Sequence, residues 1–458
     1  MRADTIAAIS TAMSNSGIGI IRISGAQSFE VADRIYRSKN GQKKLSKQKS
    51  HTIHYGYIVD GEEMIDEVLV MLMRGPHSFT AEDTVEINCH GGVLAMKKVL
   101  ETVIKYGARP AEPGEFTKRA FLNGRLDLSQ AEAVMDIIQA KNQYALKSSL
   151  GQLKGSVLKP MKELRSEILY QLAFIESALD DPEHISLEGY PQKLMEQTRQ
   201  WERKVTELID SFENGRIVKE GINTVIVGKP NAGKSSLLNV LVGEERAIVT
   251  DIAGTTRDTL EEHISISGIS LNIIDTAGIR STEDIVEKIG VEKAKEKAED
   301  ADLIIYVVDS STELDENDDA IMEMLRGKRA IVLLNKTDLK MVTTEETLRN
   351  RIEHPVIAIS AKEQTGITDL EEALKEMFFH GDLSFNDEVY ITNVRQKQAL
   401  EETRESLQQV ENSIEMEMPE DFYSIDLMSA YESLGKITGE SVGDDLVNEI
   451  FSKFCMGK

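Results

Sequence analysis

Gly228-Lys229-Pro230-Asn231-Ala232-Gly233-Lys234-Ser235 is the stretch that decides the fold of this 458-residue chain. It fits the pattern G-x-x-x-x-G-K-S, follows the apolar run Ile222 to Val227, and precedes a helical sequence that starts at Ser236. A strand, a glycine-rich loop and a helix in this order form a phosphate-binding loop, whose backbone N–H groups face the phosphates. In such a loop Lys234 reaches the β- and γ-phosphates and the Ser235 hydroxyl binds Mg²⁺. Alone, the loop indicates only a nucleotide phosphate.

Two later segments indicate guanine. Asn335-Lys336-Thr337-Asp338 ends the apolar run Ala330 to Leu334, and Ser360-Ala361-Lys362 follows the run Val356 to Ile359. A carboxylate at Asp338 can accept hydrogen bonds from both N1–H and the 2-amino group of guanine. Adenine offers neither donor, so it would leave the buried carboxylate unpaired. The second segment matches a backbone contact to the guanine carbonyl.

Asp275-Thr276-Ala277-Gly278 completes the set, after the apolar run Leu271 to Ile274. We expect Asp275 to reach Mg²⁺, directly or through water, and the Gly278 N–H to meet the γ-phosphate. All these segments in this order, each at the end of a strand, predict a GTPase domain with a parallel sheet.

The residue that usually orients the attacking water is absent from its expected place. Many GTPases carry Gln just after this last motif, but here the position is Ile279, which cannot hydrogen-bond water. Two segments are candidates for this role: the polar loop Thr250 to Asp258 and the acidic run Arg280 to Gly290. Most of those acids are also consistent with a solvated helix start. Either a partner's arginine or a bound cation must neutralise the developing phosphate charge.

Composition restricts the other possibilities. Lys and Arg number 53 against 78 Asp and Glu, a net charge of −25, which argues against broad binding to duplex DNA. There is no apolar run of 18 residues and no apolar segment of a signal peptide near Met1, so we expect neither a membrane span nor export. Two cysteines, Cys89 and Cys455, cannot form a disulfide framework. We expect a cytoplasmic protein.

The pattern of apolar and polar residues changes three times along the chain. Residues 1–119 alternate apolar runs with turns and predict an α+β domain, in which the Lys-rich stretch Lys39 to Lys49 is a surface loop. Residues 120–216 carry long amphipathic helices, the last ending at Asn214-Gly215, and residues 381–458 return to the same periodicity. We therefore expect a multidomain α/β and α protein, in which the parallel-sheet domain 217–380 is inserted into one discontinuous helical domain.

Two further features have more than one interpretation. Arg22 lies in the apolar strand Ile20 to Ile23, so it either points inward to an anionic partner or faces solvent. Cys455-Met456-Gly457-Lys458 follows an amphipathic helix, and on these residues alone it reads as a frayed C-terminus.

The segments together resemble the MnmE (TrmE) family of tRNA-modification GTPases, along the whole chain. The strings that carry the resemblance are Asp4 to Ala8, Gly17 to Gly25, Ser78 to Asp83, His90 to Gly92, Pro113 to Gly124, Gly254 to Asp258 and the terminal Cys455-x-Gly457-Lys458. This resemblance implies that the N-terminal domain dimerises and binds a one-carbon carrier of the 5-formyl-tetrahydrofolate type. By position, Arg22, Glu86, Arg125 and Lys458 correspond to the folate contacts.

The resemblance also implies a catalytic device in place of the missing glutamine. In this family K⁺ stands in for an arginine finger, bound where two G domains meet, and the matching positions are Asn231, Thr250, Ile252 and Thr255. Ser235 and Thr256 match Mg²⁺ ligands, Glu287 matches the acid that orients water, and Cys455 matches a cysteine needed for modification. The expected GTP contacts, with Lys234 also catalytic, are Asn231, Ala232, Gly233, Lys234, Ser235, Ser236, Thr250, Asp251, Ile252, Ala253, Gly254, Thr255, Thr256, Asp275, Thr276, Ala277, Gly278, Asn335, Lys336, Asp338, Ser360, Ala361 and Lys362.

The family works as a homodimer with MnmG, a partner subunit that uses FAD and NADH, in a heterotetramer that modifies C5 of the wobble uridine of certain tRNAs. Two other functions are open from the sequence. One is a ribosome-assembly or signalling switch that only binds and hydrolyses GTP. The other, a stand-alone folate-dependent transferase, leaves the GTPase segments without a role.

Overall fold

The computed structural model of the chain describes residues 4–41, 43–243, 262–266, 268–274, 301–379, 391–455 and 457. They form two compact units. One comprises Met1–Ile138, Ser149–Val205 and Gln398–Lys458, and the other comprises Gln139–Ser148 and Thr206–Lys397. The second unit holds the phosphate-binding loop, and the first unit combines an N-terminal sheet with most of the helical residues.

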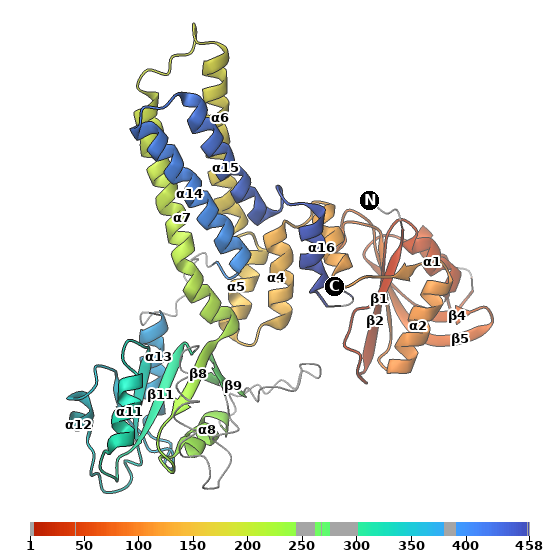
Figure 1. Cartoon of the computed structure of the whole chain (residues 1–458). Coiled ribbons are helices and arrows are strands. Elements are labelled where there is room, and N and C mark those ends of the chain that lie inside the picture. The colour runs from red at the N-terminus through yellow and green to blue at the C-terminus, as the bar shows by residue number, and fades with distance from the viewer. Residues whose placement is uncertain are drawn as a thin grey trace. The chain divides into compact units, whose positions relative to one another are not determined.

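The N-terminal part of the first unit is a seven-stranded sheet with the strand order β3-β4-β5-β6-β2-β1-β7. Its described pairs are antiparallel except for β1 with β7. Two helices cover one face of the sheet (Figure 1), and their apolar side chains pack on alternate strand residues such as Ile21, Val70 and Ile87. The elements are β1 Ile6–Ile9, β2 Ile18–Ser24, α1 Ser28–Ile35, β3 Tyr36–Arg37, η1 Leu45–Lys47, β4 Thr52–Asp60, β5 Glu63–Met73, β6 Thr84–His90, α2 Val93–Lys105 and β7 Arg109–Pro110.

The Lys-rich stretch is not simply a surface loop. Its central residue, Leu45, is fully buried in the core of the N-terminal sheet, within the short 3₁₀ helix η1. Asp33 of α1 accepts a hydrogen bond from the backbone N–H of Ser46 at 3.3 Å and so holds this turn. The single apolar residue among lysines is what anchors the segment.

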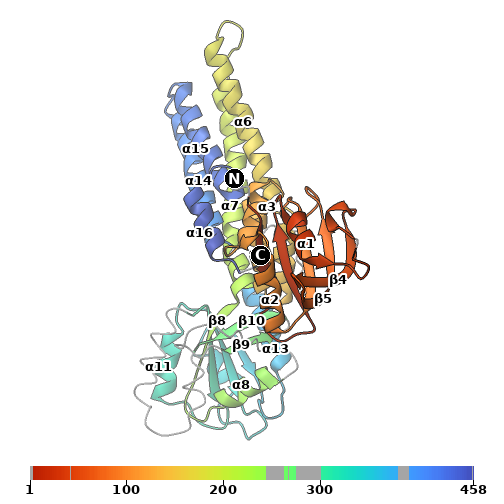
Figure 2. The same cartoon turned by 90° about the vertical axis from the view of Figure 1, so that its right-hand side faces the viewer.

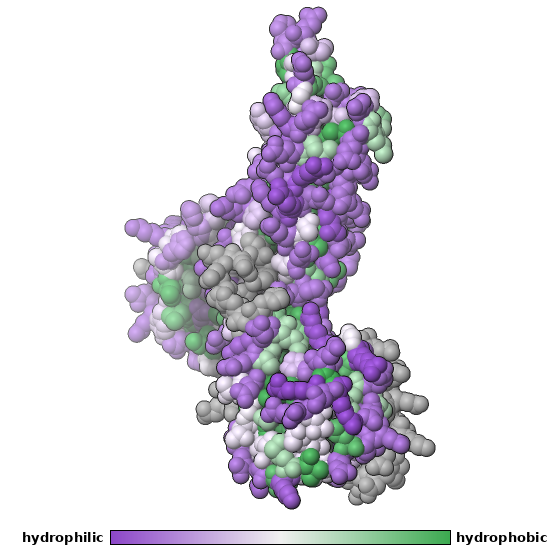
Figure 3. Space-filling view, turned by 90° about the vertical axis from the view of Figure 1, so that its left-hand side faces the viewer, coloured by the Kyte–Doolittle hydropathy of each residue, from purple (hydrophilic) through white to green (hydrophobic). Residues whose placement is uncertain are grey.

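Helices make up the rest of the first unit, and four of them, α4, α5, α7 and α14, also have residues in the second unit. α6, α15 and large parts of α7 and α14 lie side by side in both views (Figures 1 and 2). The interior is apolar, with Trp201, Leu164 and Leu427 buried, while the outer face shown in Figure 3 is mainly hydrophilic. The helices are α3 Glu115–Leu122, α4 Leu128–Gln139, α5 Gln143–Leu153, α6 Leu158–Asp180, α7 Tyr190–Glu220, α14 Val394–Glu415, α15 Glu420–Thr438 and α16 Asp444–Ser452. None of the helices in the described part of the chain is long and apolar enough to cross a bilayer.

The expected helix end at Asn214-Gly215 is wrong, because α7 continues to Glu220. Gly215 is there for a close approach: a Cβ at this position would lie 2.2 Å from the carbonyl oxygen of Ile391. A glycine inside a helix can therefore mark a packing contact rather than a terminus.

The second unit contains a six-stranded sheet with the order β13-β12-β11-β8-β10-β9, parallel except for β9. The expected strands before the sequence motifs are present as β8, β10, β12 and β13. α8 and α13 cover one face of the sheet, and α11 and α12 cover the other. The elements are β8 Ile222–Val227, α8 Lys234–Gly243, β9 Glu262–Ile266, β10 Ile269–Ile273, β11 Leu303–Asp309, α11 Glu316–Met324, β12 Ala330–Asn335, α12 Glu345–Arg349, β13 Val356–Ala358 and α13 Ile367–Phe379.

Candidate functional site

The glycine-rich loop connects β8 to the N-terminus of α8 through backbone conformations that side chains disfavour. Gly228 and Gly233 have φ angles of 150° and 99°, and Asn231 has a φ of 60°. A Cβ on Gly228 would lie 2.3 Å from the Val307 carbonyl oxygen, and one on Gly233 would lie 2.1 Å from Asn335 Nδ2. Because both glycines lack a side chain, the loop can curl in front of the helix N-terminus, where backbone N–H groups bind anions.

Lys234, the first residue of α8, turns its ammonium group back into this loop. Its Nζ donates to the carbonyl oxygens of Gly228 and Lys229, both at 2.7 Å. Burial lowers the pKa of Lys234 below its ordinary value. A cation held by neutral carbonyls is available to pair with a phosphate, and Ser235 beside it at the helix start fits the chemistry of a Mg²⁺ ligand.

Asn335, at the end of β12, joins two of the predicted nucleotide loops. Its Nδ2 donates to the Ala232 carbonyl oxygen at 2.9 Å, and its Oδ1 accepts from the Ala361 N–H at 3.0 Å. The side chain is almost fully buried. The structure therefore brings the phosphate loop and the Ser360-Ala361-Lys362 segment together through one amide.

The other residues of these two segments lie close by. Ser360 Oγ donates to Asp338 Oδ1 at 2.7 Å, and Lys362 Nζ lies 3.9 Å from Asp338 Oδ2. Lys336 has a φ of 66°, and its ammonium pairs with Asp309 at the end of β11 at 2.6 Å. Burial opposes the charge of Asp309, but the hydrogen bonds from Lys336 and Ser311 outweigh it and lower the pKa of this carboxyl.

Several predicted site residues lie outside the described residues. They are Thr250, Asp251, Ile252, Ala253, Gly254, Thr255, Thr256, Asp275, Thr276, Ala277, Gly278, Glu287 and Lys458. Their assignment to GTP, Mg²⁺, K⁺, water or folate stays a prediction from the sequence.

A second candidate site lies on the N-terminal sheet. Arg22 of β2 and Glu86 of β6 face each other in register, and Arg22 Nε donates to Glu86 Oε1 at 2.7 Å. The inward interpretation of Arg22 is therefore correct, and its anionic partner belongs to the chain itself. The pair is mostly buried, yet Nη1 of Arg22 has no hydrogen-bond partner among the residues that the structure describes. A buried guanidinium nitrogen without an acceptor fits an anionic or polar ligand.

The aromatic ring of Phe79 connects Arg22 with Arg125. The guanidinium carbons of Arg22 and Arg125 lie 5.3 and 5.0 Å from the ring centre, and Arg125 Nη1 donates to the Phe79 carbonyl oxygen at 3.0 Å. Burial lowers the pKa of Arg125. Three of the four predicted folate contacts thus share one neighbourhood. Phe79 itself was not predicted as a site residue, although it lies within the string Ser78 to Asp83.

The described end of the chain is packed against the same sheet rather than frayed. Ser10 Oγ, just after β1, donates to the Gly457 carbonyl oxygen at 3.1 Å. Gly457 has a φ of 83°, and a Cβ there would lie 2.2 Å from the Ile9 carbonyl oxygen. Cys455 is exposed, and its carbonyl oxygen accepts from the Gly114 N–H at 3.4 Å.

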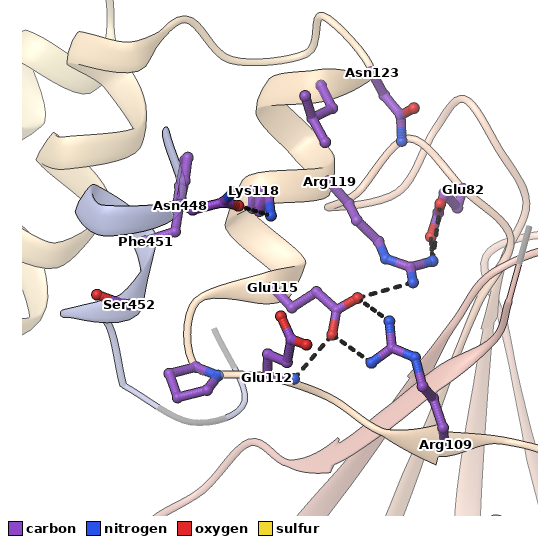
Figure 4. Close-up of a pocket in the computed structure, with 12 residues that line it drawn as sticks. Glu82, Arg109, Glu112, Glu115, Lys118, Arg119, Asn123, Asn448, Phe451 and Ser452 are labelled. Atoms are coloured by element: carbon purple, nitrogen blue, oxygen red, sulfur yellow. Dashed lines mark hydrogen bonds and ion pairs between the residues drawn. The ribbon is translucent and has the colours of Figure 1, made fainter. Parts of the chain in front are cut away.

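A cavity of about 600 Å³ lies beside α3 and α16 (Figure 4). Arg109 and Arg119 line it, but Asp4, Glu115 and Glu82 already hold both guanidinium groups. This closed network ties β7 to α3 and leaves the arginines little capacity to bind a ligand.

The layout of the second unit is that of a P-loop GTPase: a phosphate loop between β8 and α8, with two base-reading segments after β12 and β13. Residues 128–455 match the family model described as the MnmE helical domain, and residues 5–125 match that of the GTP-binding protein TrmE N-terminus. The chain is 61% identical over 458 residues to a tRNA modification GTPase MnmE of Lachnoclostridium phytofermentans, covering 100% of both chains. It is 51% identical over 462 residues to the MnmE of Acetivibrio thermocellus, covering 99% of each.

The chain therefore belongs to the MnmE family of tRNA modification GTPases, and it is a GTP hydrolase. The expected fold class is confirmed: an N-terminal TrmE domain, a helical MnmE domain and a G domain with a parallel sheet. The G domain of the T. maritima FeoB iron transporter aligns with 34% of this chain and 98% of its own, at 28% identity and a TM-score of 0.26, a likeness too weak to add to the assignment.

Proposed function

We propose that this GTPase, together with an FAD-dependent MnmG-like subunit, installs an aminomethyl-type group, carboxymethylaminomethyl included, at C5 of the wobble uridine of certain tRNAs. Full-length identity of 61% to a relative named for tRNA modification supports this substrate. The net charge of −25 fits a division of labour in which the partner provides much of the tRNA contact, together with FAD and NADH. Because its substrate is tRNA, we propose that the protein is cytoplasmic.

The one-carbon unit comes from a carrier of the 5-formyl-tetrahydrofolate type at the N-terminal sheet. The observation that carries this proposal is the pair of Arg22 and Glu86, with an unpartnered buried nitrogen beside Phe79 and Arg125. In this assignment Arg22, Arg125 and Lys458 bind anionic or carbonyl oxygens of the carrier, while Glu86 accepts from the N–H groups of its pterin ring. The bound carrier supplies the carbon for transfer. Cys455 takes part in the modification.

GTP hydrolysis uses the phosphate loop of the second unit. Lys234 binds the phosphates, Asn335 and Asp338 hold the base, and Ser235 with Thr256 binds Mg²⁺. Glu287 orients the attacking water in place of the glutamine that Ile279 replaces. Asn231, Thr250, Ile252 and Thr255 hold K⁺, which when bound supplies the positive charge of an arginine finger.

The active form is a homodimer, and an exposed apolar area on β4 and β5 supports it. α1 and α2 cover only one face of the N-terminal sheet. On the other face Tyr55 of β4 lies opposite Leu69 of β5, with Ile53 two residues away on the same side. These three side chains are 45%, 47% and 60% exposed. Exposed apolar side chains clustered on a sheet face are typical of a protein–protein interface. Pairing of the G domains then assembles the K⁺ sites.

Nucleoside analysis of tRNA tests the proposal. A strain that lacks this chain should contain unmodified wobble uridine in the affected tRNAs, and expression of the parent chain should restore the modification. The Arg22→Ala variant should not restore it, whereas Arg34→Ala, which changes a half-exposed arginine of α1, should. If the deletion strain still carries the C5 modification at its wobble uridine, the proposal is wrong. The alternative of a GTPase switch without one-carbon chemistry then remains.

A further inference from the structure

We propose that Lys229, inside the phosphate loop, is a positioning residue for GTP hydrolysis because its side chain ties the loop to the buried carboxylate of Asp318 on α11. Lys229 occupies one of the unspecified positions of the G-x-x-x-x-G-K-S pattern, so the motif assigns it no role. The inference rests on the GTPase activity and on the placement of Lys234 at the phosphates.

The tie is a short ion pair in a protected place. Lys229 Nζ lies 2.6 Å from Asp318 Oδ2, and the Asp318 side chain is only 1% exposed. A second, more exposed carboxylate, that of Asp315, lies 3.1 Å from the same ammonium. Burial works against the charge on Lys229, but the hydrogen bonds to Asp318 and Asp315 outweigh it and raise the pKa of the ammonium. Lys229 is therefore charged at neutral pH. Because Asp318 is buried, water cannot take the place of the lysine ammonium without a large cost in free energy.

Asp318 is itself fixed from two other directions. Its Oδ1 accepts from the hydroxyl of Tyr306, a fully buried residue of β11, at 2.6 Å. Its Oδ2 accepts from the backbone N–H of Asp315 at 2.9 Å, and together they form the capping box of α11. Burial, and then the hydrogen bond to Asp318, raise the pKa of Tyr306, so the tyrosine stays a donor. The anchor point of Lys229 is thus a rigid part of the sheet and of α11.

The other end of Lys229 lies at the site of phosphate chemistry. Its backbone carbonyl oxygen accepts from Lys234 Nζ at 2.7 Å and from the Ala232 N–H at 3.3 Å. Lys229 therefore contacts α11 through its side chain and the phosphate-binding Lys234 through its backbone carbonyl. Among the residues that the structure describes, Lys229 makes the ion pairs that join the loop to α11, so we expect the segment 229–231 to move more when they are lost.

Kinetics of the full-length chain test this role. Lys229→Met removes the charge and keeps the length of the side chain. We expect kcat for GTP to fall about tenfold with little change in KM, because Asn335 and Asp338 still bind the base while the phosphates lose their fixed cradle. Lys229→Arg should retain most of the activity, since a guanidinium group also reaches Asp318. The matched control is Arg326→Met, which removes one exposed charge just after the opposite end of α11.

A double-mutant cycle separates positioning from a general loss of stability. If Lys229 acts through Asp318, the double variant Lys229→Met/Asp318→Asn should be no slower than the slower single variant. Thermal melting of each variant gives the folded fraction, to which rates are normalised. Three results would overturn the proposal: a normalised kcat in Lys229→Met within twofold of the parent, no rescue by arginine, or fully additive losses in the double variant. If Asp318→Asn does not fold, the comparison of Met with Arg at position 229 still decides.

Discussion

Arg22 and Glu86 lie opposite each other on neighbouring strands and form a 2.7 Å ion pair, although 64 positions separate them in the chain. The family resemblance implies that both residues contact folate, but it does not imply that they pair with each other. Because they pair, a carrier that binds here must either share the guanidinium group of Arg22 with Glu86 or displace Glu86 from that group. The unpartnered Nη1 of Arg22 allows sharing, because the ligand can use the nitrogen that Glu86 does not.

The first prediction concerns this pair. Arg22→Ala should weaken binding of 5-formyl-tetrahydrofolate by about 2 kcal/mol or more, roughly 30-fold, because it removes a buried charge partner and leaves Glu86 unpaired. Isothermal titration calorimetry of the full-length chain measures this. Arg34→Ala should bind as tightly as the parent. Equal folate affinity in the parent chain, Arg22→Ala and Arg34→Ala would show that Arg22 does not contact the carrier.

The second prediction concerns base recognition. Asp338→Asn should raise KM for GTP by about 100-fold or more, because the amide no longer accepts from both N–H groups of guanine. The same variant should gain activity on xanthosine triphosphate, whose 2-carbonyl accepts from the new amide. Asp369→Asn, an exposed change on α13, is the control. An unchanged preference for guanine in Asp338→Asn would contradict the assignment.

The third prediction concerns K⁺. GTP turnover at fixed ionic strength should rise about tenfold or more in KCl over NaCl. The arginine finger that K⁺ replaces here is worth roughly 10³ to 10⁵ in kcat, and Na⁺ is too small for such a site. Asn231→Gly should lose most of the stimulation without backbone strain, since glycine accepts the φ of 60° at this position.

The control for that experiment is Glu417→Gly, which places glycine at another positive-φ position, outside the G domain. It should keep the full K⁺ effect. Equal turnover in the two salts for the parent chain would exclude K⁺ as the missing positive charge.

The fourth prediction concerns acid stability. Burial raises the pKa of Glu115, but hydrogen bonds from Arg109, the Glu112 N–H and Arg119 outweigh it, so the pKa lies below its ordinary value of 4.5. The folded state therefore favours the ionised carboxylate. The stability that this group contributes is complete above about pH 4.5 and is lost as the pH falls from there through the folded-state pKa.

Calorimetric melting of the parent and of Glu115→Gln between pH 7 and pH 3.5 tests this. The first pH lies above the ordinary pKa of a glutamate and the second lies below it. At pH 7 the variant should be less stable by about 3 kcal/mol, because the buried Arg119 and the partly buried Arg109 both lose a carboxylate. The difference between the two proteins should shrink as the pH falls. A constant difference would show that the charge of Glu115 is not what stabilises the network.

The sequence predicted best what depends on local pattern. β8, β12 and β13 begin where the apolar runs begin, because strands buried on both faces read as continuous apolar segments. The loop glycines and Asn335 followed from the same motifs. Contacts between residues that are distant in the sequence could not be predicted from it. The pairing of Arg22 with Glu86 depends on strand register, and the pairing of Lys229 with Asp318 depends on how α11 packs against β11. Gly215 and Leu45 show the same limit, since each is explained by a distant contact.

The most direct test of the account is the nucleotide specificity of the purified chain. Phosphate release should be measured over a range of GTP and of ATP concentrations that gives kcat/KM for each nucleotide, in KCl and Mg²⁺. The account predicts hydrolysis of GTP at least about 100-fold faster, in kcat/KM, than that of ATP, because Asp338 is left unpaired by adenine. Comparable rates for the two nucleotides would contradict it.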